Sequence, residues 1–150
     1  MTLGRGCWIS SQTAAEMNKL KSMNEKGTPA MTVTDMDTDC LFCKIRDGRV
    51  PANVTYRDEY VLAFADIGPK APFHDLVVPL RHVATLADAS AEDAEIYGRM
   101  MVVASKLARE SGRATGGFRV VMNAGPDAGQ SVHHVHLHVL AGRPLAWPPG

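Results

Sequence analysis

The sequence predicts a single α+β domain built on an antiparallel β-sheet of about five strands. Short runs with strand character are separated by short polar or Pro/Gly connectors, and neighbouring strands joined in this way pair antiparallel. One long segment instead repeats its apolar residues at helical spacing. The length of 150 residues suits one domain with a core of its own.

The organised part of the chain is expected to begin with a short helical turn at Asp39-Cys40, which ends at Asp47-Gly48. The five expected strands are Val54–Arg57, Tyr60–Asp66, Asp75–Pro79, Phe118–Asn123 and His133–Ala141. Between the third and fourth strands we expect one long helix from Ala91 to Glu110, with a capping-box-like start at Ser90 and a stop at Gly112. Its apolar face, expected to form core or a subunit interface, comprises Tyr97, Met100, Met101, Ala104, Leu107 and Ala108.

Composition limits the partners and the compartment. Residues 1–39 carry scattered polar residues and a weak helical rhythm, so we expect a flexible N-terminal extension. Lys and Arg number 16, as do Asp and Glu, and no apolar stretch approaches the roughly 20 residues of a membrane span, so we expect neither nucleic acid nor membrane as a partner. The three cysteines do not resemble a disulfide framework, which favours a reducing cytoplasm.

The most informative run lies between residues 130 and 140. Three histidines alternate there with three aliphatic residues, namely His134, His136 and His138 with Val135, Leu137 and Val139. In an extended strand the three imidazoles share one face, roughly 6.5–7 Å apart, a spacing that suits a phosphate-sized group. Imidazole can attack, donate a proton or bind an anion near neutral pH. A packing role and a cluster that only binds metal remain as alternatives.

A C-x-x-C motif stands at the predicted N-terminal turn. Cys40 and Cys43 are three residues apart, so a helical turn can direct both thiolates to one metal ion. The same spacing is compatible with two buried thiols or with a redox pair.

Over about residues 40–150, these features together resemble the histidine triad (HIT) superfamily. The resemblance implies that this segment is a HIT domain. The matching segments are Cys40-Leu-Phe-Cys43-Lys-Ile, Val50-Pro51-Ala52, Leu62-Ala-Phe64-Ala-Asp66-Ile67, Leu76-Val-Val-Pro79, Val121-Met-Asn123-Ala-Gly125 and His134 through Leu140. The proline-rich tail with Trp147 resembles the Hint branch, the nucleoside phosphoramidate hydrolases. The resemblance implies a HIT-like fold, a homodimer, and hydrolysis of purine nucleoside 5′-phosphoramidates of the AMP or GMP type without a catalytic cofactor.

The resemblance also implies roles for particular residues. His136 would attack the α-phosphorus to give a nucleotidyl-histidine, with its ring oriented by the main-chain carbonyl of His134. A protonated His138 would contact the phosphate oxygens. The remaining implied site residues are Ser131 for the phosphate or the departing amine, His74 in support of the triad, Asp66 on the ribose, Val50, Phe64 and Ile67 around the base, Asn123 on the sugar or phosphate, and Gly129 and Gln130 in the loop beside the phosphate.

Some HIT proteins complete a structural zinc site with two histidines, and here the matching residues are His82 and His134, beside Cys40 and Cys43. Two other functions remain open: a dinucleoside polyphosphate hydrolase of the same superfamily, and a nucleotide-binding or scaffold protein whose hydrolysis is incidental.

Overall fold

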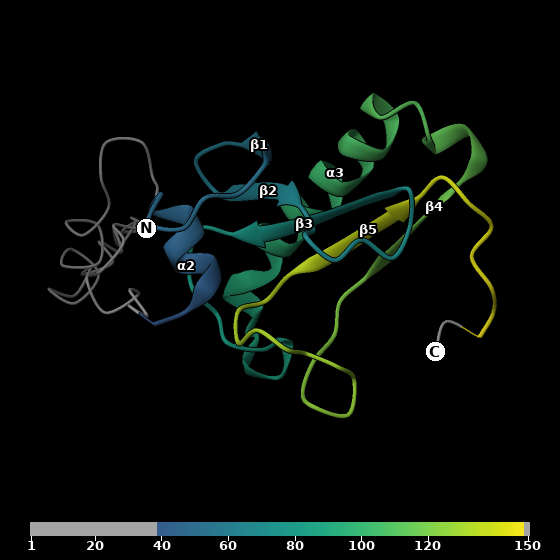
Figure 1. Ribbon diagram of the computed structural model, residues 1–150. Coiled ribbons are helices and arrows are strands. Elements are labelled where there is room, and N and C mark those ends of the chain that lie inside the picture. The colour runs from purple at the N-terminus through teal and green to yellow at the C-terminus, as the bar shows by residue number, and fades with distance from the viewer. Residues whose placement is uncertain (1–38, 149–150) are drawn as a thin grey trace, which may run out of the picture. The chain divides into compact units, whose positions relative to one another are not determined.

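The computed structural model describes residues 39–148, all within one compact unit, and the expected extension therefore lies outside the described residues except for Asp39. The elements follow the chain in the order shown in Figure 1. They are α2 (Leu41–Arg46), β1 (Val54–Arg57), β2 (Val61–Ala65), β3 (Phe73–Pro79), α3 (Ala94–Glu110), β4 (Phe118–Val121) and β5 (Leu137–Ala141), with short 3-10 turns at Leu86–Asp88, Ala91–Asp93 and Ala114–Gly116.

The strands form one five-stranded sheet in the order β1-β2-β3-β5-β4, and every neighbouring pair is antiparallel. The last strand in sequence, β5, lies between β3 and β4, so it is bonded on both sides (Figure 1). The predicted antiparallel sheet of about five strands with one long helix is confirmed. Because β5 is central, His138 is held between Leu76 of β3 and Val121 of β4, which come from distant parts of the sequence.

The alternation of side chains along the strands divides the core into two clusters. One packs against α3 and includes Val61, Val77 and Val139 with Met100 and other α3 residues. The second joins the other face of β2 and β3 to α2, and comprises Cys40, Phe42, Cys43, Leu62, Phe64, Leu76 and Val78. Each fully buried apolar side chain contributes about 1.5–3 kcal/mol relative to exposure. The second cluster therefore anchors the short helix that carries both cysteines.

Helix α3 begins close to the predicted position. A 3-10 turn at Ala91–Asp93 precedes it, and the Asp93 carboxylate accepts from the Ser90 backbone N–H at 2.8 Å. Met100 and Leu107 are buried, but Met101 is 51% exposed, so it lies outside the core, and its place in a subunit interface stays a prediction. Among residues 39–148, no helix combines the length and the apolar character that crossing a membrane requires.

The largest difference from the predicted boundaries concerns β5. This strand begins at Leu137 and not at His133, because the preceding backbone leaves the ladder. The N–H of Val135 donates to Val83 O at 2.7 Å, and the N–H of His134 donates to Val132 O at 2.9 Å. Of the three histidines, only His138 therefore lies within a regular strand.

Candidate active site and metal site

The three histidines share one side of the sheet although two of them precede the strand. Their neighbours Val135, Leu137 and Val139 all enter the cluster that packs against α3. The predicted separation of imidazoles from aliphatic side chains is therefore observed. The rings of His136 and His138 lie 5.0 Å apart between centroids, closer than an extended strand would place them.

His136 is buried and held in one orientation. Its Nδ1–H donates to the His134 main-chain oxygen at 2.7 Å, which is the hydrogen bond expected from the sequence. The edge-on ring of Phe42 lies 5.2 Å away, between centroids. Because a neutral imidazole carries one proton, the bond at Nδ1 leaves a lone pair on Nε2. This is the arrangement that a nucleophilic nitrogen requires.

His138 is the end of a short hydrogen-bonded chain. The backbone N–H of Lys70 donates to His74 Nδ1 at 3.1 Å, so the proton of a neutral His74 sits on Nε2. His74 Nε2 lies 2.9 Å from His138 Nδ1 and donates to it. His138 then carries its own proton on Nε2. These hydrogen bonds make Nε2 of His138, the outer nitrogen that does not contact His74, a hydrogen-bond donor.

The protonation of His138 differs from the sequence expectation. Burial, aided by the nearby His136 and His74, lowers the pKa of His138 to about 4, although Asp66 acts in the opposite direction. Burial also lowers the pKa of His74. Protonating the pair would place a second hydrogen between Nε2 and Nδ1 or displace the Lys70 N–H. His138 is therefore a neutral N–H donor in this state, and not the imidazolium that was expected.

Asp66 lies directly after β2, beside the two histidines. Its Oδ1 accepts from the Gly68 backbone N–H at 2.7 Å. Its Oδ2 is 3.4 Å from His74 Nε2 and 4.0 Å from His138 Nδ1. The carboxylate thus favours a proton on the facing nitrogen of His74, while it remains partly accessible at the edge of the site.

The three apolar residues expected around a base are in different surroundings. Phe64 is buried in the α2 cluster, with its ring 5.4 Å from that of Phe42. Val50 is half-buried, and Ile67 is fully exposed next to Asp66. The structure thus leaves Val50 and Ile67 accessible to a ligand and places Phe64 in the core.

The loop before the histidines is stabilised from within. Gly125 and Gly129 have φ angles of +83° and +79°, which favour glycine. Gln130 is buried, and its amide accepts from the Gly125 N–H and donates to the oxygens of Ala84 and Val132. Its amide is therefore hydrogen-bonded within the protein and ties the loop to the segment at Ala84.

The polar residues beside this loop are accessible. Ser131 is exposed and Asn123 is half-buried, and they lie at the two ends of the loop. Sequence reasoning missed Phe42, whose ring contacts both His134 and His136 at centroid distances of 5.9 and 5.2 Å. Its position inside the C-x-x-C motif was the available signal.

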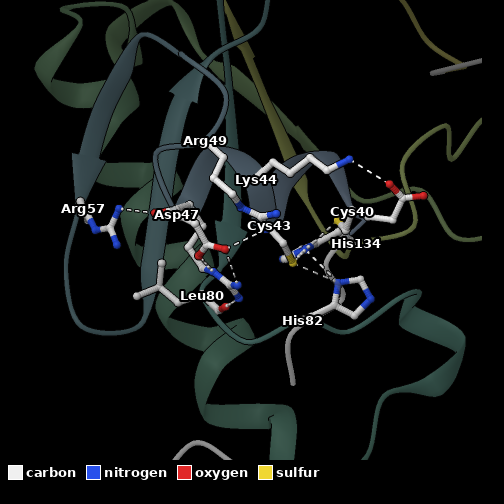
Figure 2. Close-up of polar contacts among 11 residues, drawn as sticks. Cys40, Cys43, Lys44, Asp47, Arg49, Arg57, Leu80, His82 and His134 are labelled. Carbon is white, nitrogen blue, oxygen red and sulfur yellow. Dashed lines mark hydrogen bonds and ion pairs between the residues drawn. The ribbon is translucent and has the colours of Figure 1, made fainter. Parts of the chain in front are cut away.

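A second set of side chains, here named the four-ligand cluster, converges on the other side of His134 (Figure 2). It consists of Cys40, Cys43, His82 and His134, whose ligand atoms lie within 4.8 Å of one another. His134 Nδ1 is 3.5 Å from Cys40 Sγ and 3.6 Å from Cys43 Sγ. His82 Nδ1 is 3.4 Å from Cys43 Sγ and 3.2 Å from His134 Nδ1.

These distances and the neutral state of His134 fit a zinc ion, whereas burial raises the pKa of the Cys43 thiol to about 12, so that thiol has to lose its proton to the solvent on binding the metal. A tetrahedral zinc with usual Zn–S and Zn–N bond lengths places its ligand atoms roughly 3.3–3.8 Å apart. His134 Nε2–H donates to Pro79 O at 2.9 Å, which leaves Nδ1 unprotonated and directed toward the cysteines. Burial lowers the pKa of His134 to about 4, so the ring is neutral, as a metal ligand must be.

Comparison with known proteins gives consistent relatives. The HIT domain family matches residues 47–145. Purine nucleoside phosphoramidase from Escherichia coli K12 is 43% identical over 110 residues, which is 73% of this chain and 92% of that protein. An uncharacterized HIT-like protein from Synechococcus elongatus is 44% identical over 115 residues, 77% of this chain and 100% of that protein.

A solved structure agrees with these matches. The crystal structure of a HIT family hydrolase from Legionella pneumophila superposes with a TM-score of 0.74 at 46% identity, and covers 75% of this chain and 100% of that chain. Since the family match and relatives of more than 40% identity span most of the described residues, this chain belongs to the HIT family.

Proposed function

We propose that this protein hydrolyses purine nucleoside 5′-phosphoramidates through a covalent nucleotidyl intermediate on His136. The observation that carries the proposal is the 2.7 Å bond from His136 Nδ1 to the His134 carbonyl, which leaves the Nε2 lone pair available. The name of the E. coli relative, purine nucleoside phosphoramidase, supports the substrate class.

The reaction consists of two displacements at phosphorus. In the first, the His136 Nε2 lone pair forms a bond to phosphorus while the phosphorus–nitrogen bond of the substrate breaks. The electron pair goes to the leaving nitrogen, which takes a proton from solvent water and departs as an amine. In the second, a water molecule bonds to phosphorus and releases a proton, and the electrons of the histidine–phosphorus bond return to Nε2. One water is consumed, and a nucleoside monophosphate and an amine are formed.

The other residues bind and stabilise. His138 donates its Nε2–H to a non-bridging phosphate oxygen, where charge increases in the transition state. Asp66 accepts from the ribose hydroxyls, and the exposed Ile67 with the half-buried Val50 covers the base. Ser131 and Asn123 hydrogen-bond the phosphate or the sugar.

We further propose that the four-ligand cluster holds one structural zinc ion. Two thiolates and two neutral imidazoles fill a tetrahedral shell, so no position remains for water or substrate. The ion would cross-link α2 to the segment before β5. Protein prepared without chelators should contain about one zinc per chain by metal analysis, and zinc-free protein of equal stability would contradict the proposal.

We also propose that the protein is a homodimer whose C-terminal tail influences the choice of leaving group. Met101 and Val102 are exposed on α3, and Trp147 in the tail is 83% exposed. Residues that contact a second subunit are exposed in this way when one chain is considered alone. Removal of residues 144–150 should preserve turnover but change the preference among amine leaving groups. A monomer in light scattering would contradict the dimer.

The proposed activity is tested by a turnover assay on adenosine 5′-phosphoramidate and on a diadenosine polyphosphate. The wild type should be faster on the phosphoramidate, and the reverse order would favour a dinucleoside polyphosphate hydrolase. His136→Ala should lose at least about 10⁴-fold in kcat and still bind AMP. His133→Ala, a change of the same type at an exposed neighbouring position, is the control. Equal turnover by the two variants would contradict the assignment of His136.

A further inference from the structure

A hydrogen-bonded path leads from the C-terminal tail to His138. The Arg143 guanidinium donates to the Lys70 carbonyl from Nη2 at 2.9 Å and from Nε at 3.3 Å. The N–H of the same Lys70 donates to His74 Nδ1 at 3.1 Å, and His74 donates to His138 at 2.9 Å. Lys70, in the β2–β3 loop, is thus hydrogen-bonded to the tail through its carbonyl and to His74 through its N–H.

The tail packs closely against the β2–β3 loop at Gly142, one residue before Arg143. Gly142 has a φ of +94°, and a Cβ at this position would lie 2.5 Å from Arg113 Nη1 and 3.1 Å from Pro72 Cβ. The register places Phe73 at the start of β3 opposite Ala141 at the end of β5, so the loop and the tail meet at one end of the sheet (Figure 1). This approach brings Arg143 within reach of the Lys70 carbonyl.

The direction of the hydrogen bonds in the path decides whether His138 Nε2 carries a proton. While the Lys70 N–H occupies His74 Nδ1, His74 must donate from Nε2, and His138 keeps its proton on the outer Nε2. If Lys70 moved away, only the Asp66 carboxylate, 3.4 Å from His74 Nε2, would still favour a proton on that nitrogen. Part of the population could then carry the His74 proton on Nδ1 and accept at Nε2. His138 would then donate inward from Nδ1, and its outer nitrogen would lose the N–H.

We propose that Arg143 is a positioning residue that acts through Lys70 to keep the His74–His138 pair in the tautomers that leave an N–H on His138 Nε2. The proposal deepens the proposed function, since the N–H is the donor assigned there to the phosphate. Arg143 itself touches neither substrate nor the reacting atoms.

The tautomers are measured directly by ¹⁵N NMR of the imidazole nitrogens in the full-length protein at pH 7. In the wild type, His74 and His138 should both carry the proton on Nε2. In Arg143→Ala the resonances of both rings should shift toward the Nδ1–H form. Arg119→Ala is the matched control, because Arg119 also holds the tail, through the oxygens of Leu145 and Ala146, and carries the same charge. It should retain the wild-type tautomers.

A kinetic measurement complements the spectra. Arg143→Ala should lower kcat about three- to tenfold with an unchanged KM, because a donor that acts mainly in the transition state is lost from part of the population. Arg143→Lys, which keeps the charge and one donor that can reach the Lys70 carbonyl, should recover most of this loss. If Arg143→Ala misfolds, Arg143→Met, which keeps an aliphatic side chain without the donors, replaces it in the comparison.

Two results would overturn the proposal: wild-type tautomers in Arg143→Ala, or the same shift in Arg119→Ala, which would indicate only a loosened tail. If the wild type hydrolysed no phosphoramidate, the proposed function would fail while the ¹⁵N spectra would still decide the role of Arg143.

Discussion

Phe42 contacts His134 of the four-ligand cluster and His136 of the candidate active site, and in both rings a hydrogen bond to a backbone carbonyl sets the tautomer. In the four-ligand cluster, His134 donates from Nε2 to Pro79 O and turns a bare Nδ1 inward, toward two thiols and another imidazole. In the candidate active site, His136 donates from Nδ1 to His134 O and keeps a bare Nε2. A backbone carbonyl selects the tautomer in both cases, but a different nitrogen is left available.

The surroundings of the two groups differ as much as their tautomers. The ligand atoms of the four-ligand cluster face one another, and both cysteines and His134 are buried. Among the residues assigned to the candidate active site, Ser131 and Ile67 are instead exposed. His134 belongs to both groups, one through its ring and one through its carbonyl. The ring of His134 thus belongs to the proposed metal site, while its carbonyl orients the proposed nucleophile, His136.

The largest effect should follow from changing the open group alone. His138→Ala removes the neutral donor proposed for the phosphate, and kcat should fall about 10²–10³-fold. Metal content should remain that of the wild type, since His138 is not part of the four-ligand cluster. A kcat within a factor of about three of wild type would show that His138 is not needed at the phosphate.

Changing the closed group should chiefly cost stability. Cys43→Ala removes a ligand, and the free energy of unfolding should fall by at least about 3 kcal/mol in chemical denaturation. A strong chelator should lower the thermal midpoint of the wild type but not that of this variant. Cys7→Ala, at a cysteine outside the described residues, is the control. Equal midpoints for both variants would remove the metal from the account.

Acid tests whether the His138 ring is held neutral in the folded protein. His138 has a pKa lowered to about 4 in the folded protein, against an unfolded value near 6.5, so the unfolded chain binds its proton first. The stabilising difference is present above pH 6.5 and is lost as the pH falls toward 4. The loss in unfolding free energy over this window should be smaller for His138→Gln than for the wild type. Parallel curves would mean that the ring is not held neutral.

The contact between the two groups should give the smallest effect. Phe42→Leu keeps an apolar side chain between His134 and His136 but loses the ring edge, and should cost about 1–1.5 kcal/mol of stability. A loss of kcat by about two- to threefold should accompany it, because His136 is less firmly oriented. Leu41→Ala, on the more exposed side of α2, is the control and should change neither quantity.

Much of this arrangement could be predicted from local patterns. The strand candidates, the helix start at Ser90 and the alternation of histidines with aliphatic residues all rest on spacing within a short segment, and the structure follows them. The C-x-x-C turn and the family resemblance were sufficient to select His82 and His134 as companions of the cysteines, and these atoms do converge.

The rest depends on contacts that no local pattern encodes. The late start of β5 follows from the bond between Val135 and Val83. The neutral state of His138 follows from burial and from its neighbour His74, which lies 64 residues earlier in the chain. Gln130 was assigned to a ligand because of its position, but its amide hydrogen-bonds Gly125 and Val132 near the loop and the distant Ala84 carbonyl.

The central claim is that His136 becomes covalently bonded to the nucleotide. It is tested most directly by mixing the protein with adenosine 5′-phosphoramidate, quenching under conditions that preserve phosphorus–nitrogen bonds, and mapping the added mass by peptide mass spectrometry. We expect an adenylyl group on His136 that forms and decays at rates consistent with turnover, and none in His136→Ala. Turnover without any adduct, or an adduct on another residue, would contradict it.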